Sequence, residues 1–185
     1  MRIVALSIFL SLFVIQSTFA ADDIVAVLTG DWNDDEKQDA VMLVAPKADE
    51  EDSALRIYLA EGPGKLELKE NVPNFVWGAW TLYGQMPGLK ALPRGSFAVT
   101  SGNFAIGRNR WEQAITIAYR DGQFLVAGYT YNDYDTLDPN NTTNCDLNLL
   151  SGRGVVDDKP VRFPSRRTPV ADWKSEAGYN ICDAN

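Results

Sequence analysis

The chain has 185 residues, of which 17 are basic and 25 acidic, with two cysteines and no histidine. The absence of histidine excludes Ser-His-Asp and Cys-His catalytic systems, imidazole general bases and zinc sites with histidine ligands. Two cysteines are too few for an all-thiolate zinc site. The content of 45% hydrophobic and 23% charged residues is that of a globular domain.

The N-terminal segment has the features of a secretory signal peptide. Arg2 is followed by an apolar run of 13 residues, Ile3 to Ile15, and Thr18-Phe19-Ala20 offers small residues at the two positions that signal peptidase reads. We therefore predict a signal peptide over residues 1–20 and a single domain over residues 21–185. A membrane anchor is the alternative, but a span needs about 20 apolar residues. After cleavage we expect no membrane span and a periplasmic or secreted protein.

Acidic charge is concentrated in the N-terminal part of the predicted domain. Residues 21–85 carry 14 acidic and 5 basic residues, whereas residues 86–185 carry 11 of each. The net charge of the whole chain is −8, which opposes binding to nucleic acid or to an anionic membrane surface. We expect no nucleic-acid partner, and the acidic part can attract cations or a basic partner.

Strand signals dominate the chain after residue 21. Short apolar or alternating runs, several of them bounded by Gly or Pro residues, predict strands; they are Ile24–Leu28, Ala40–Ala45, Leu55–Leu59 and Lys65–Lys69. The acidic run at residues 48–52 is read as a solvated hairpin loop. Region 71–111 contains three prolines and several glycines, so we predict loops there with one or two short strands.

The clearest hairpin lies between Glu112 and Tyr131, where Asp121-Gly122 supplies the turn that two-residue hairpins favour. Further along the chain, three short strand runs and one helical turn are predicted; the strand runs are Leu147–Leu150, paired with Val155-Val156, and Val161–Phe163, and the helical turn is Asp172–Ala177. The expected fold class is mainly β, a single domain of antiparallel meander and hairpins with little helix. A sandwich, a barrel and a partial propeller-like sheet all remain open.

Cys145 and Cys182 both lie in the mature chain. An exported protein meets an oxidising compartment, in which a pair of cysteines is usually bridged. A disulfide between them would tie the C-terminal tail to the body of the domain. No Cys-x-x-Cys motif is present, so nothing indicates redox catalysis.

The segment at residues 31–39 has the spacing of a calcium-binding loop. Oxygen-bearing side chains fall at loop positions 1, 3, 5 and 9, and position 7 would offer a backbone carbonyl; these residues are Asp31, Asn33, Asp35, Asp39 and, at position 7, Lys37. Hard cations such as Ca²⁺ take six to eight oxygen ligands, which alternate residues of a tight loop can supply. The predicted cofactor is therefore Ca²⁺.

The segment from Thr29 to Val44 resembles one repeat of the FG-GAP or VCBS type, found in integrin-like β-propellers. The family pattern is a strand, then Gly-Asp-x-Asn-x-Asp-x-x-x-Asp, then an apolar strand, and the chain follows it from Gly30 to Val41. The resemblance implies Ca²⁺ on the odd-numbered residues of the loop. Only one copy is present, so a full propeller of such repeats is excluded.

The loop departs from the family at loop positions 4 and 6, where glycine is usual. Asp34 and Glu36 stand there, and glutamate in particular disfavours a left-handed backbone. Two interpretations follow: an occupied but strained calcium loop, or an acidic turn-forming loop without an ion. A second Asx-rich stretch, at residues 132–141, lacks the alternating spacing and is interpreted as a surface loop.

The segment from Gly107 to Gly154 resembles part of small exported bacterial proteins of unknown role, which favours the periplasm of a Gram-negative bacterium. Aromatic residues on loops can stack on sugar rings or anchor a protein partner; the candidates are Trp77, Trp80, Tyr83, Trp111, Tyr129, Tyr131 and Tyr134. We therefore expect a non-enzymatic binding or accessory protein whose partner is an envelope protein or glycan. The alternatives are an inhibitor of a cell-wall enzyme and a carboxylate-dependent hydrolase.

Overall fold

The computed structural model describes residues 22–46, 52–79, 84–85, 87–138, 140–174 and 176–184. The predicted signal peptide over residues 1–20 lies outside these residues, as do Trp80, Tyr83 and most of the acidic run at residues 48–52. Within the described part of the chain, no helix has the length and apolarity that a membrane span requires.

The described residues form antiparallel strands with little helix, as the sequence predicts. The elements in chain order are β1 (Ile24–Gly30), β2 (Asp39–Val44), β3 (Asp52–Gly62), β4 (Lys65–Trp77), β5 (Gly88–Leu92), β6 (Ser96–Asn103), β7 (Asn109–Arg120), β8 (Gln123–Asp135), β9 (Thr142–Asn148), β10 (Arg153–Val156), β11 (Lys159–Arg162), β12 (Thr168–Pro169), the 3₁₀ helix η2 (Val170–Asp172) and α1 (Glu176–Asp183). An N-terminal sheet has the order β1-β2-β3-β4, and a large sheet has the order β11-β10-β9-β8-β7-β6-β5, with β12 paired to β8.

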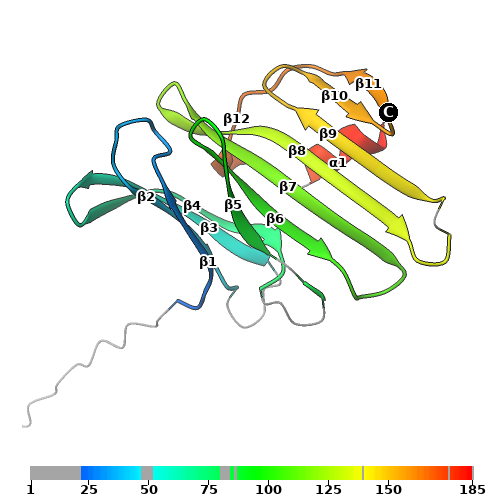
Figure 1. The fold of residues 1–185 in the computed structure, drawn as a ribbon, viewed down its shortest axis with the longest axis horizontal. Coiled ribbons are helices and arrows are strands. Elements are labelled where there is room, and N and C mark those ends of the chain that lie inside the picture. The colour runs from blue at the N-terminus through cyan, green and yellow to red at the C-terminus, as the bar shows by residue number, and fades with distance from the viewer. Residues whose placement is uncertain are drawn as a thin grey trace, which may run out of the picture.

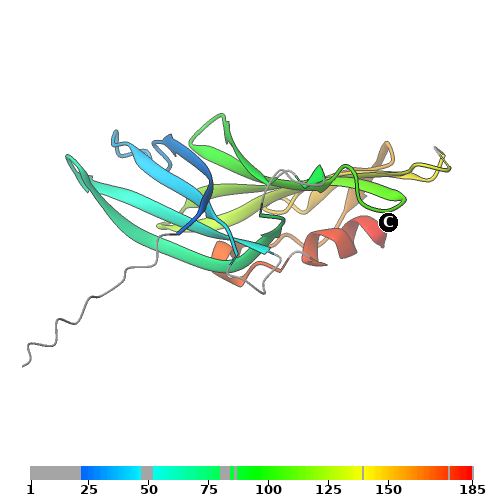
Figure 2. The same ribbon diagram turned by 90° about the horizontal axis from the view of Figure 1, so that it is seen from below.

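The two sheets form a sandwich-like arrangement in which the large sheet is the longer layer. Figure 1 shows β1 to β4 gathered at one end of the molecule and β5 to β11 spreading across the rest. Figure 2 shows the molecule turned by 90°. In this view the N-terminal sheet and α1 lie on the same side of the large sheet, at opposite ends of that sheet. One face of the large sheet is therefore covered by two separate elements.

The core lies between the facing sides of the two sheets. Leu43 and Ile57 of the N-terminal sheet and Phe97 and Ile117 of the large sheet are fully buried. Trp32, in the loop after β1, joins this core because its ring contacts Phe97 edge-on, with 5.2 Å between the ring centroids. The loop thus contributes directly to the packing between the sheets.

The predicted hairpins are confirmed where glycine and aspartate define the turns. β7 and β8 pair on either side of Asp121-Gly122, and both turn residues have positive φ angles, 52° and 83°. The strands predicted from Ile24 to Lys69 correspond to β1 to β4, which pair in sequence order. β9 and β10 also pair, although β9 begins earlier than predicted, at Thr142, and residues 149–150 lie in the turn.

The prediction of loops with one or two short strands over region 71–111 is wrong. β4 continues to Trp77, and the region also contains β5, the eight-residue strand β6 and the start of β7. β4 accommodates Pro73 because it is an edge strand with a local irregularity: Ser53 pairs with Val76 but Leu55 pairs with Val72. Prolines are tolerated at edges and bulges, where no ladder hydrogen bond is lost.

Two predictions about the second half of the chain also need correction. Residues 132–135 do not belong to a surface loop, because β8 continues to Asp135 and pairs with β7 and β9. The single helical turn predicted over Asp172–Ala177 is instead the end of η2 followed by an eight-residue helix, α1, that starts at Glu176. The helix was missed because its polar residues obscure the 3.6-residue period.

The predicted disulfide is present between Cys145 of β9 and Cys182 of α1, with the Cα atoms 5.8 Å apart. Both cysteines are buried. The bond therefore fixes α1 against the large sheet.

Replacing both cysteines by serine is expected to lower the free energy of unfolding by about 4 kcal/mol, because the unfolded chain regains the entropy of an open loop of about 37 residues. Urea unfolding of the wild type and the double variant measures the difference. A reductant should bring the wild type to the midpoint of the variant and leave the variant unchanged. A loss below about 1 kcal/mol would contradict this stabilising role.

Candidate functional site

A groove lined by aromatic rings lies where the end of the N-terminal sheet, the large sheet and α1 meet. We call it the aromatic groove; it has a volume of about 430 Å³ and is open to solvent. Its lining residues are Asp52, Trp77, Trp111, Gln113, Tyr129, Tyr131, Glu176 and Tyr179. They come from β3, β4, β7, β8 and α1, so the groove exists only in the folded chain.

Strand register explains why the large sheet provides the floor of this groove. Ser101 of β6, Gln113 of β7, Tyr131 of β8 and Cys145 of β9 are paired in one row across four strands. Successive inward-facing residues of one strand are two positions apart. The inner face therefore changes along β7 from buried Ile115 to the groove residues Gln113 and Trp111.

The groove rings are packed against one another. The ring centroids of Trp77 and Trp111 are 5.4 Å apart, and those of Tyr131 and Tyr179 are 5.2 Å apart at an interplanar angle of 83°. Trp111 and Tyr131 lie nearly parallel, at 23° and 6.4 Å. Contacts of this kind hold aromatic side chains in defined orientations. The aromatic surface is therefore preformed.

A buried polar network supports the rings from below. Gln113 donates a hydrogen bond through Nε2 to Ser101 Oγ at 2.9 Å and accepts one at Oε1 from the Tyr129 hydroxyl at 3.1 Å. The Tyr131 hydroxyl donates to Asp133 Oδ2 at 3.3 Å. Burial raises the pKa of both tyrosine hydroxyls well above 10, and nearby Asp133 contributes for Tyr131. Both phenols therefore stay neutral in the folded protein.

α1 closes the groove because it lies directly on the large sheet. A Cβ atom at Gly178 would lie 2.5 Å from the Tyr129 ring, so only glycine allows this approach. The disulfide to Cys145, which pairs with Tyr131, holds the same helix. Tyr179 is thereby brought onto Tyr131 while 42% of its surface remains exposed.

Four of the aromatic residues singled out in the sequence meet in the groove: Trp77, Trp111, Tyr129 and Tyr131. Tyr134, 51% exposed, is not among the lining residues, and Trp80 and Tyr83 lie outside the described residues. The sequence reasoning missed Tyr179. A signal was present, since Tyr179 lies one helical turn before Cys182 and shares its face of α1.

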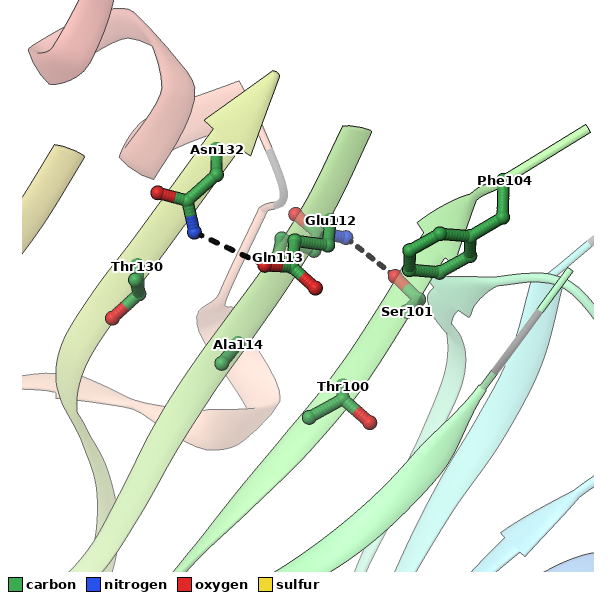
Figure 3. A pocket seen from close by; sticks show the side chains of 8 residues that line it. All are labelled: Thr100, Ser101, Phe104, Glu112, Gln113, Ala114, Thr130 and Asn132. Atoms are coloured by element: carbon green, nitrogen blue, oxygen red, sulfur yellow. Dashed lines mark hydrogen bonds between the residues drawn. The ribbon is translucent and has the colours of Figure 1, made fainter. Parts of the chain in front are cut away.

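A second pocket, of about 310 Å³, lies on the outer face of the large sheet. Figure 3 shows the small side chains of Thr100, Ala114 and Thr130 on three neighbouring strands, with the Phe104 ring to one side. Glu112 and Asn132 are joined by a hydrogen bond of 3.4 Å. With one ring and small side chains, this surface offers less to a ligand than the aromatic groove.

The calcium-type loop adopts a closed turn in which its acidic side chains bond to the backbone. The Asp31 carboxylate accepts hydrogen bonds from the amides of Asp35 and Glu36, at 3.1 and 2.8 Å. Fully buried Asp39 accepts one from Trp32 at 2.9 Å and one from Ala60 at 2.9 Å. Asp39 therefore joins the loop to β3.

Backbone strain falls at the two loop positions where the resembling repeats carry glycine. Asp34 and Glu36 have φ angles of 63° and 66°. The side-chain oxygen Oδ1 of Asn33 is buried without a hydrogen-bond partner, whereas Asp35 is paired with the Lys37 ammonium at 2.9 Å. This hydrogen-bonded ion pair lowers the pKa of Asp35. Among the described residues, no three Asp, Glu, Cys or His side chains are grouped as a metal site.

Comparison with protein family models, with curated proteins and with solved structures finds no match to this chain. The geometry of the aromatic groove and of the loop is therefore the basis for a functional proposal.

Tyr129 and Tyr131 are expected to ionise at higher pH in the native protein than in the unfolded chain, where phenols titrate near 10. Because the folded pKa is raised, the stabilisation is fully present below pH of about 10 and is lost as the pH rises further. Tyrosinate absorbance in native and denaturing buffer measures this. Tyr131→Phe should remove one late-titrating group. Coincident native and denatured curves would show that these phenols are not held neutral.

Proposed function

We propose that this chain is an exported, non-enzymatic binding protein and that the aromatic groove is its binding site. The observation that carries the proposal is the convergence of Trp77, Trp111, Tyr131 and Tyr179 from three separate parts of the fold onto one open groove. Exposed aromatic residues in a concave, preformed surface are typical of binding hot spots. The periplasm is the proposed location, and the disulfide supports an oxidising compartment.

The rigidity of the groove also supports a binding function. Ring-to-ring contacts and the buried network of Gln113, Ser101 and Tyr129 fix the floor, and the disulfide fixes α1. A preformed surface loses little conformational entropy when a ligand binds. The proposed partner is an envelope protein or glycan, and an inhibitor of a cell-wall enzyme would use the same groove to hold its target.

Tyr179→Ala is expected to weaken partner binding by about tenfold to thirtyfold, because it removes an exposed ring from the groove. Tyr134→Ala is the matched control, since this tyrosine is similarly exposed but lies outside the groove. Retention on immobilised envelope proteins and co-sedimentation with purified cell-wall glycan measure the binding. Equal retention of the two variants would contradict the proposed site, and release of sugar fragments would favour the hydrolase alternative.

We also propose that the loop at residues 31–39 binds Ca²⁺ and thereby stabilises the junction of the two sheets. Asp31, Asn33, Asp35 and Asp39 carry oxygen atoms of the kind that Ca²⁺ takes, although both carboxylate oxygens of Asp31 and of Asp39 already accept backbone hydrogen bonds. The buried, unpartnered Asn33 Oδ1 is an atom that a bound cation would satisfy. The Lys37 ammonium is the opposing feature, because it already neutralises Asp35.

Saturating Ca²⁺, at about a hundred times its dissociation constant, is expected to raise the free energy of unfolding by about 2.7 kcal/mol. Lys37→Met should bind Ca²⁺ about fivefold more tightly, because a positive charge next to Asp35 is removed. Lys159→Met on β11 is the control for loss of a lysine elsewhere. Calorimetric melting with and without Ca²⁺ measures both effects. The proposal fails if neither the wild type nor Lys37→Met responds, or if an Asp31→Ala/Asp35→Ala variant responds equally.

A further inference from the structure

If the aromatic groove is the binding site proposed above, the charges that line it determine which class of ligand it binds. Within the part of the chain that the structure describes, two charged residues line it, Asp52 of β3 and Glu176 of α1, and no described lysine or arginine does. Asp133 lies just beyond, bonded to the Tyr131 hydroxyl. Carboxylates at the border of a partly desolvated groove attract cations and repel anions.

The aromatic rings add to the same preference. The face of an aromatic ring carries negative electrostatic potential, and a cation within about 6 Å of the ring centroid is attracted to it. Trp77 and Trp111 are only half-buried, and Tyr179 is exposed, so all three present ring surface to an incoming group. Carboxylates and ring faces together favour a flat or compact cation over a neutral ligand.

We propose that the aromatic groove binds the arginine side chain of a basic partner protein. A guanidinium group is planar, stacks on aromatic faces and pairs with a carboxylate through two parallel hydrogen bonds. Both ring surfaces and carboxylates line the groove, and it is open, so a side chain attached to a larger molecule can enter. The net charge of −8 on the whole chain favours approach of a basic protein.

The polar groups at the floor of the groove offer few hydrogen bonds to a neutral ligand, because they are bonded to one another. The amide of Gln113 is bonded to Ser101 and Tyr129, and the Tyr131 hydroxyl is bonded to Asp133. A glycan could stack on the tryptophans, but it carries no positive charge to pair with the carboxylate of Glu176. A guanidinium can stack on the rings and pair with a carboxylate at the same time.

The test uses the tripeptide acetyl-Gly-Arg-Gly-amide and its citrulline counterpart, which keeps the shape of the side chain and removes its charge. Chitotriose is the neutral glycan probe. Titration calorimetry gives the affinities, and the indole NMR signals of the tryptophans locate the contact. The arginine peptide is expected to bind at least about tenfold more tightly than the citrulline peptide, and more weakly as ionic strength rises.

Glu176→Gln keeps the shape of an exposed side chain and should weaken arginine binding about threefold to fivefold. Combination with Asp52→Asn should extend the loss to about tenfold. Asp158→Asn, in the β10–β11 turn, is the matched control, because asparagine also tolerates its φ of 64°. The melting temperature of each variant confirms that the fold is retained, and Glu176→Gln alone suffices if Asp52→Asn disturbs it.

Three outcomes would overturn the inference: equal binding of the citrulline peptide, binding of chitotriose but not of the arginine peptide, or no binding of the arginine peptide at millimolar concentration. In the first two outcomes, a loss of binding in Tyr179→Ala would leave the aromatic groove as the binding site of another ligand class. If Tyr179→Ala also left every envelope interaction unchanged, the proposed function itself would fail.

Discussion

The structure depends on how one long sheet buries its inner face. The large sheet has more strands than the N-terminal sheet that packs on it, so sheet-on-sheet packing covers only one end. The other end is covered by α1, an eight-residue helix that is too short to be stable by itself. The disulfide between Cys145 and Cys182 supplies the missing constraint. The aromatic groove lies between the N-terminal sheet and α1, on the part of the inner face that neither of them covers.

This arrangement makes the core and the candidate site parts of one continuous surface. Along the inner face of β7 the residues change from Ile117 and Ile115, which are fully buried, to Gln113 and Trp111. The side-chain amide of Gln113 bonds to Ser101 and Tyr129 on the neighbouring strands. These hydrogen bonds stabilise the site and need no bridging water. The half-buried Asp52 and the exposed Glu176 also line the groove, so negative charge lies next to its aromatic surface.

The calcium-type loop also packs into the core of the sandwich. Asp39 is buried and bonded to the backbone of both the loop and β3, and Trp32 packs into the core beside Phe97. The strained residues Asp34 and Glu36 are thereby held in place by tertiary contacts. Much of the acidic charge of the loop is balanced by backbone amides and by Lys37. These hydrogen bonds and the ion pair give the acidic residues of the loop a structural role in the sandwich.

The sequence by itself determined the β class, the hairpin at Asp121-Gly122, the disulfide and most of the aromatic residues of the groove, because turn chemistry, alternation and cysteine number are local signals. Tertiary structure decided which aromatic residues meet. A bulge in β8, where Thr116 pairs with Gly128 but Ile117 pairs with Val126, turns Tyr129 and Tyr131 to the inner face. A strict alternation from Phe124 would place them outside. The continuation of β4 past Pro73 and the docking of α1 likewise depend on partners distant in the chain, which no local pattern can specify.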